Sequence, residues 1–147
     1  MKLVVDSSVL LKWFIAETDS PQAQMVLSRL LAGECSLHLP SLALYEVQHG
    51  LIKNVEPDEA AQAMAGFWAL LDHEAVTLHE ISRELFAATH TIATYDTGGQ
   101  GHVSSYDALF HALALDLGAT LITADIAHIR KTKAAFGAVL SLADYTA

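Results

Sequence analysis

The sequence is poor in cysteine and in positive charge. Cys35 is the only cysteine among 147 residues, so the chain can form neither an internal disulfide nor a cysteine-based metal cluster, and a reducing, cytoplasmic location is expected. Only 8 residues are Lys or Arg, whereas 17 are Asp or Glu, and the formal net charge is −9. A broad basic face that grips nucleic acid by its phosphates is therefore not expected.

Long hydrophobic runs are also absent. No apolar segment approaches the roughly 20 residues that a membrane span needs, and Asp6 interrupts the first apolar run, so neither a signal peptide nor a membrane segment is expected. Hydrophobic residues make up 52% of the chain and charged residues 17%, which excludes an intrinsically disordered protein. The length and the lack of a linker predict that residues 1–147 form a single domain.

Short apolar runs of strand length alternate with segments whose apolar residues recur at the helical period. The predicted strands are 3–5, 36–39, 75–78, 120–122 and 138–140. The predicted helices are 8–15, 20–32, 41–53, 58–71, 81–95 and 104–117. This alternation predicts a three-layer α/β/α sandwich around a mainly parallel sheet of about five short strands.

Capping residues and glycines mark the boundaries of these elements. Helix starts are indicated by Ser20-Pro21, Pro40-Ser41, Pro57-Asp58 and the capping-box pattern Ser104-x-x-Asp107. Gly33 and Gly118 are expected to end two helices. Residues 96–103 contain three glycines and are expected to form a mobile loop.

Four acidic residues fall near the carboxyl edge of the predicted sheet, where open α/β sheets bind ligands. They are Asp6, Glu46, Asp107 and Asp125. The three aspartates can also be explained as helix caps, and Glu46 as part of a narrow polar helix face. Four carboxylates at one edge, however, would repel one another by up to about 4 kcal/mol per close pair at an effective dielectric near 20. A hard cation such as Mg²⁺ or Mn²⁺ is the usual partner of such an all-oxygen site.

Four segments in order carry a family resemblance. They are Val5-Asp6-Ser7-Ser8-Val9-Leu10-Leu11-Lys12-Trp13-Phe14, Pro40-x₅-Glu46-Val47, Ser105-Tyr106-Asp107-Ala108 with Ala112-Leu113-Ala114, and Leu121-Ile122-Thr123-Ala124-Asp125. In order, spacing and flanking residues the chain resembles the PIN-domain family, and within it the VapC-type toxins of prokaryotic toxin–antitoxin pairs. The resemblance covers nearly the whole chain.

This resemblance implies a metal-dependent endoribonuclease that uses Mg²⁺ or Mn²⁺. The family's catalytic and metal-binding acids carry over onto Asp6, Glu46, Asp107 and Asp125, and its orienting hydroxyls onto Ser8 and Thr123. A cognate antitoxin and a homodimer are also implied. Some relatives have a further acid shortly after the last aspartate, where this chain has Ile126, Ala127 and His128, so the number of metal ions stays open. The glycine-rich loop 96–103 is longer than is usual in the family.

Hydrolysis by a metal-activated water would leave a 5′-phosphate and a 3′-hydroxyl on the RNA. Lys12 lies near Asp6 in the sequence, and Arg130, Lys131 and Lys133 form the only basic cluster, so these residues are candidate phosphate contacts. The cluster can equally be a solvated helix end. Because positive charge is scarce, recognition of a structured RNA by its shape is favoured.

Other chemistries fit the sequence less well. A ribonuclease that uses two histidines as acid and base would need a pair among eight scattered histidines, and nothing in the sequence pairs them. A di-iron carboxylate protein would need two Glu-x-x-His motifs on a four-helix bundle, and only Glu46-x-x-His49 is present. A phosphoaspartate enzyme would need a second acid where Ser8 stands. A catalytically inactive PIN-like module that acts only through protein partners remains open, because fold alone does not decide activity.

Overall fold

The structure, a computed structural model, describes residues 1–15 and 21–146. Five strands form one sheet in the order β3-β2-β1-β4-β5, and all four neighbouring pairs are parallel. The strands are β1 (Lys2–Val5), β2 (Ser36–Pro40), β3 (Val76–His79), β4 (Thr120–Thr123) and β5 (Val139–Ser141). The predicted parallel sheet is confirmed, and each strand boundary lies within one residue of its prediction.

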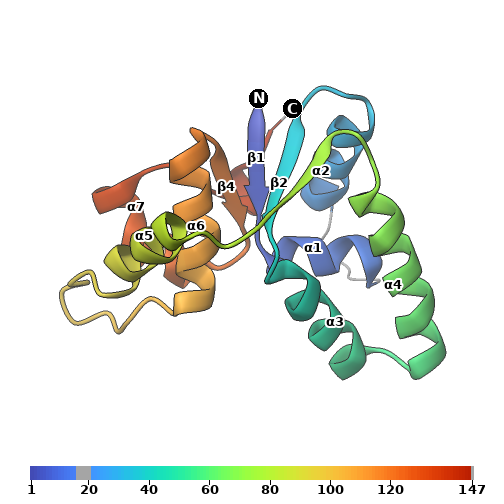
Figure 1. Ribbon diagram of the computed structural model, residues 1–147, viewed down its shortest axis with the longest axis horizontal. Coiled ribbons are helices and arrows are strands. Elements are labelled where there is room, and N and C mark those ends of the chain that lie inside the picture. The colour runs from blue at the N-terminus through green and yellow to red at the C-terminus, as the bar shows by residue number, and fades with distance from the viewer. Residues whose placement is uncertain (16–20, 147) are drawn as a thin grey trace.

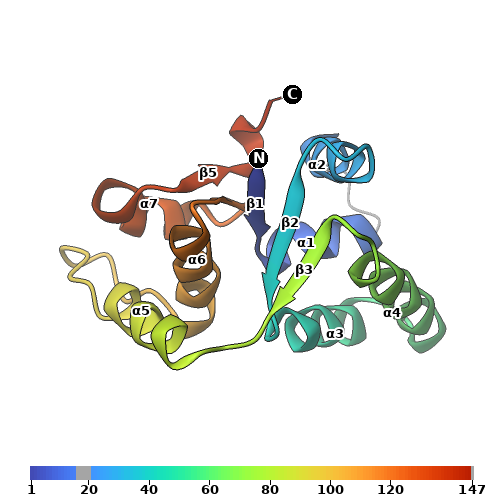
Figure 2. The same ribbon diagram turned by 45° about the horizontal axis from the view of Figure 1, so that its top comes forward.

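Helices cover both faces of this sheet. They are α1 (Ser7–Phe14), α2 (Pro21–Leu31), α3 (Ala43–Asn54), α4 (Pro57–Leu71), α5 (Arg83–Ala93), α6 (Ser105–Leu117) and α7 (Ile126–Phe136), and a short 3₁₀ helix, η1 (Leu142–Asp144), follows β5. Figures 1 and 2 show α1 to α4 on one side of the strands and α5 to α7 on the other. The predicted three-layer α/β/α sandwich is therefore confirmed.

The strand order reverses beside β1. From β1 the chain adds β2 and then β3 on one side, and later adds β4 and then β5 on the other. In open parallel sheets the crevice at such a reversal, outside the carboxyl ends of the strands, is the ordinary ligand site. Here that crevice lies at the ends of β1 and β4, whose central residues Val4, Val5, Leu121 and Ile122 are buried.

Of the four predicted helix starts, two are confirmed. Ser104 caps α6 by accepting a hydrogen bond from the N–H of Asp107, and Pro57 is the first residue of α4, both as predicted. The prediction that Pro40-Ser41 starts a helix is wrong. Pro40 is the last residue of β2, and the Ser41 N–H donates to the carbonyl oxygen of His79, so strand pairing continues past the proline. Ser20, the other proposed cap, lies outside the described residues.

Glycine chemistry fits the two predicted helix ends. Gly118 ends α6 with a left-handed φ of 63°, a conformation that costs glycine little. Gly33, with φ 76°, follows the end of α2. The predicted loop 96–103 lacks helix and strand and has its own hydrogen bonds, such as Thr97 Oγ1 to the Gly101 carbonyl oxygen at 2.7 Å.

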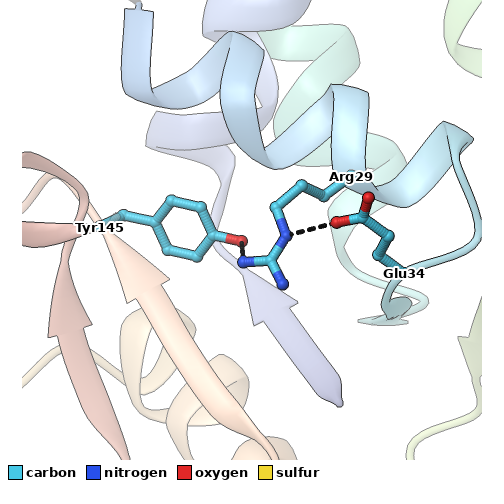
Figure 3. Close-up of polar contacts among 3 residues, drawn as sticks. All are labelled: Arg29, Glu34 and Tyr145. Atoms are coloured by element: carbon cyan, nitrogen blue, oxygen red, sulfur yellow. Dashed lines mark hydrogen bonds and ion pairs between the residues drawn. The ribbon is translucent and has the colours of Figure 1, made fainter. Parts of the chain in front are cut away.

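The segment after β5 is tied back to α2. Figure 3 shows the Arg29 side chain between two partners: its Nε donates to Glu34 Oε2 at 2.9 Å, and its Nη1 donates to the Tyr145 hydroxyl at 3.0 Å. Tyr145 is 5% exposed, so this contact fixes the last described turn against the N-terminal half of the molecule. In the described ranges no helix is both long enough and apolar enough to cross a membrane.

Candidate active site

Asp6 is the centre of the polar network at the carboxyl ends of β1 and β4. It directly follows β1 and is 7% exposed. Its Oδ1 accepts hydrogen bonds from the Ser8 hydroxyl and from the Val9 N–H, and its Oδ2 accepts one from the Thr123 hydroxyl. Burial nevertheless raises the pKa of Asp6 from 3.8 to about 6, and the nearby charge of Asp107 adds to the rise. Desolvation thus outweighs three hydrogen bonds that favour the ionised form.

Two hydroxyl groups join this acid to the chain that follows β4. The Ala124 N–H donates to Ser8 Oγ at 3.2 Å, and the Asp125 N–H donates to Thr123 Oγ1 at 3.0 Å. Each hydroxyl therefore donates to Asp6 and accepts from the β4–α7 connection. The sequence predicted Ser8 and Thr123 as orienting hydroxyls, and this is the arrangement that such a role requires.

Glu46 approaches from the first turn of α3. Figure 1 shows α1 and α3 starting near one another at the ends of β1 and β2. Glu46 Oε2 accepts a hydrogen bond from the Ser7 hydroxyl at 3.0 Å. Glu46 Oε1 is buried and has no hydrogen-bond partner among the residues that the structure describes. Burial raises the pKa of Glu46, and the charges of Asp107 and Asp6 add to the rise.

Ser7 was missed by the sequence reasoning as a site residue. Two adjacent hydroxyls follow Asp6, and only the first turn of α1 decides that Ser8 turns back to Asp6 while Ser7 reaches α3. The signal available in the sequence was the doubled serine itself.

The other two acids begin helices on the opposite side of the sheet. Asp107 is the third residue of α6, half-buried, and its charge acts on both Asp6 and Glu46. Asp125 is the N-cap of α7, and its Oδ1 accepts from the His128 N–H at 3.1 Å. The helix-cap explanation is thus correct for the local geometry of Asp6 and Asp125. It leaves the unpartnered oxygen of Glu46 unexplained.

The four acids come from four elements around one crevice, yet they stand apart. Among the described residues no three His, Cys, Asp or Glu side chains form a group that could hold a metal ion as they stand. The donor chemistry nevertheless fits a hard divalent cation. All donors are oxygens, the charge of Asp107 adds to the rise that burial causes in the pKa of Asp6 and of Glu46, and one oxygen of Glu46 is buried without a donor.

The basic residues that were predicted to contact phosphate lie in different surroundings. Lys12 lines a hollow of about 310 Å³ together with Ala124 and Ile126, which flank Asp125. Lys131 Nζ donates to the carbonyl oxygen of His102 at 3.1 Å, so it holds the glycine-rich loop to α7. Arg130 and Lys133 are exposed on α7, which also fits a solvated helix end.

The prediction that no histidines pair is wrong. His38 Nδ1 lies 2.9 Å from His79 Nε2, and His111 Nδ1 lies 2.9 Å from His128 Nε2. The partners are 41 and 17 residues apart in the chain, so no local motif announces them. His111 and His128 are 0% and 4% exposed, which leaves no room for RNA between them.

Comparison with known proteins finds one matching family model and a related ribonuclease. The model of the PIN domain matches residues 3–134. Ribonuclease VapC3 of Pyrobaculum aerophilum is 31% identical over 133 residues, which cover 85% of this chain and 90% of that protein.

Two solved structures share the fold at low identity. VapBC2 from Rickettsia felis, bound to a DNA fragment from its promoter, superposes with a TM-score of 0.70 at 17% identity and covers 96% of this chain and 98% of that one. Mycobacterium tuberculosis VapC20, a sarcin-ricin loop cleaving toxin, superposes with a TM-score of 0.65 at 16% identity and covers 91% of this chain and 95% of that one. These likenesses match the α/β sandwich described above.

Proposed function

Because this chain belongs to the PIN domain family, we propose that it is a metal-dependent endoribonuclease and the toxin of a toxin–antitoxin pair. The relative at 31% identity is a ribonuclease, and a structural neighbour cleaves the sarcin-ricin loop. The single observation that carries the metal dependence is Glu46 Oε1, a buried carboxylate oxygen without a donor next to two other acids.

The residues that would hold the ion are Asp6, Glu46, Asp107 and Asp125. At such a site a bound Mg²⁺ or Mn²⁺ supplies Lewis-acid activation of water and of the phosphoryl group. The chain supplies orientation: Ser8 and Thr123 hold the two oxygens of Asp6, and Ser7 holds one oxygen of Glu46. A positive charge at Glu46 Oε1 would offset the repulsion among the acids and the cost of leaving that oxygen without a donor.

RNA is then bound with few phosphate contacts. With a net charge of −9, the chain has little long-range attraction for a polyanion. Lys12, the exposed Arg130 and Lys131 are the candidate contacts, and Lys131 also holds the loop through the carbonyl oxygen of His102. A folded RNA recognised by shape suits this scarcity better than an arbitrary single strand.

A cognate antitoxin is the proposed protein partner, and a homodimer the proposed assembly. The Rickettsia felis neighbour is a VapBC2 assembly, which supports the first. Expression of this chain without a partner is expected to arrest growth, and Asp107→Ala is expected to relieve the arrest. Equal growth of wild type and variant would argue against the toxin assignment.

The nuclease assignment is tested by cleavage of a structured RNA with Mg²⁺ or Mn²⁺ and with a chelator. We expect metal-dependent cleavage that leaves 5′-phosphates. Asp107→Asn is expected to abolish this cleavage. Asp116→Asn is the matched control, because Asp116 is an exposed aspartate on the same helix. Cleavage in chelator that yields 2′,3′-cyclic phosphates would instead favour a histidine mechanism. Antitoxin binding without any cleavage would favour an inactive module.

A further inference from the structure

The buried histidine pair His111–His128 is a polar contact that the proposed chemistry does not use. The ring centroids are 5.1 Å apart, and His111 Nδ1 lies 2.9 Å from His128 Nε2. The other nitrogen of His111, Nε2, lies 2.7 Å from the carbonyl oxygen of Gly137. Phe136 packs its ring edge-on against His111, with centroids 6.1 Å apart. These contacts form a bridge from α6 to α7, here called the histidine bridge.

The protons in the histidine bridge can be assigned from chemistry. A carbonyl oxygen only accepts, so His111 Nε2 carries the proton that is donated to Gly137. In a neutral ring His111 Nδ1 is then an acceptor, and His128 Nε2 must donate to it. Burial lowers the pKa of both rings, which fits two neutral histidines. One orientation of each ring satisfies every bond, so the bridge is directional.

The bridge lies one helical turn behind two of the candidate acids. His111 follows Asp107 by four residues on α6, so the two side chains share a helix face. His128 follows Asp125 by three residues on α7, and the backbone N–H of His128 donates to Asp125 Oδ1. The charges of both acids act on His128. His111 therefore touches α7 in the turn that Asp125 caps, and again at Gly137, directly after the last turn.

We propose that the histidine bridge is a positioning device that fixes Asp107 relative to Asp125 and thereby sets the affinity of the site for a divalent cation. This inference rests on the proposed function. Two apolar side chains could fill the same space with similar stability, but they would leave α6 and α7 free to slide. A directional hydrogen bond fixes the separation of the two helix starts.

The test compares three variants by Mn²⁺ affinity and by melting temperature in chelator. His128→Leu removes the donor to His111. His128→Gln restores it, because the glutamine amide nitrogen takes the place of Nε2. His38→Leu breaks the other histidine pair, with the same 2.9 Å contact, on β2.

For His128→Leu we expect Mn²⁺ affinity to fall 10- to 100-fold, the range for groups that orient metal ligands. His128→Gln is expected to stay within about threefold of wild type, and His38→Leu to bind Mn²⁺ as wild type does. Mn²⁺ is titrated by the loss of the free-ion signal in electron paramagnetic resonance. Should His128→Leu fail to fold, His128→Asn, whose amide is too short to reach His111, takes its place.

Two results would overturn the inference in distinguishable ways. If His128→Leu melts at a lower temperature but binds Mn²⁺ like wild type, the bridge only stabilises the core and the proposed function stands. If the wild-type protein itself binds no Mn²⁺, the proposed function fails and the positioning role fails with it.

Discussion

The two sides of the site differ in how completely their acids are satisfied. On the β1–β4 side, both oxygens of Asp6 accept hydrogen bonds from Ser8, Val9 and Thr123. On the α3 side, Glu46 has one bond, from Ser7, and one buried oxygen with none. The first side is organised without a ligand. The second is organised only in part, and we propose a divalent cation as the partner of its free oxygen.

The largest expected effect is a loss of RNA cleavage when the acid on either side of the site is neutralised. Asp6→Asn and Glu46→Gln should each lower kcat/KM by about 10³-fold, since Lewis-acid stabilisation is worth several kcal/mol. Both changes keep the shape of the side chain. The check is single-turnover cleavage with Mn²⁺, with Asp116→Asn as control. Full activity of Glu46→Gln would reduce the α3 side to a structural role.

The next effect is a pH dependence of stability in the metal-free protein. The pKa of Asp6 is raised from 3.8 to about 6, so its contribution to stability is present below pH 3.8 and is lost as the pH rises through about 6. At neutral pH, Asp6→Asn should therefore be more stable than wild type in chelator, by at most about 3 kcal/mol. Asparagine keeps the helix cap.

Urea unfolding between pH 4 and 8 measures this difference. The gap between variant and wild type should be small at pH 4 and grow toward pH 8. The slope that remains in Asp6→Asn is the sum of two opposing contributions. Glu46, whose pKa is raised, loses stability as the pH rises, whereas the buried His111 and His128, whose pKa values are lowered, gain it. A variant less stable than wild type at pH 7 would mean that the acid of Asp6 is needed as a structural cap.

A smaller loss of stability and activity is expected when a hydrogen bond to Asp6 is removed on the β1–β4 side. Thr123→Val leaves Asp6 Oδ2 and the Asp125 N–H without their shared hydroxyl, and should cost about 1–3 kcal/mol of stability and 10- to 100-fold in activity. Thr123→Ser keeps the hydroxyl and should recover most of both. Equal behaviour of the two variants would contradict the orienting role.

The smallest effect is expected when the single hydrogen bond that Glu46 accepts on the α3 side is removed. Ser7→Ala removes the one hydrogen bond of Glu46 and should cost about 0.5–1.5 kcal/mol in chelator. Saturating Mn²⁺ should reduce that loss, because the ion would then hold the carboxylate. Thermal melts of Ser7→Ala with and without Mn²⁺ provide the check. A loss that Mn²⁺ leaves unchanged would place Glu46 outside the metal site.

Sequence reasoning recovered the fold because its signals are local. Apolar runs such as Leu121-Ile122 are buried on both faces of a parallel sheet, and such runs are legible in the sequence. Pro40 was misleading, because a proline beside a serine indicates a helix start, whereas here it ends β2. α5 begins at Arg83, two residues after the predicted start, because Ser82 caps the helix by accepting a hydrogen bond from the N–H of Leu85.

For the site, the sequence could predict which acidic residues follow strands, but not which groups their side chains contact. Asp6 and Asp125 could be placed from the strands that precede them, and the topology then puts both at the reversal of strand order. The partners of their side chains could not be foreseen. The Ser7–Glu46 contact spans 39 residues and the His111–His128 contact 17, so both depend on helix packing that no local pattern encodes.

We infer that a divalent cation is the partner that Glu46 Oε1 lacks in the metal-free protein. A crystal structure grown with Mn²⁺, phased on the anomalous signal of the ion, tests this most directly. We expect an ion in the crevice with Glu46 Oε1 and an oxygen of Asp6 among its ligands. An ion-free crevice at saturating Mn²⁺, with Glu46 Oε1 hydrogen-bonded to another protein group, would contradict it.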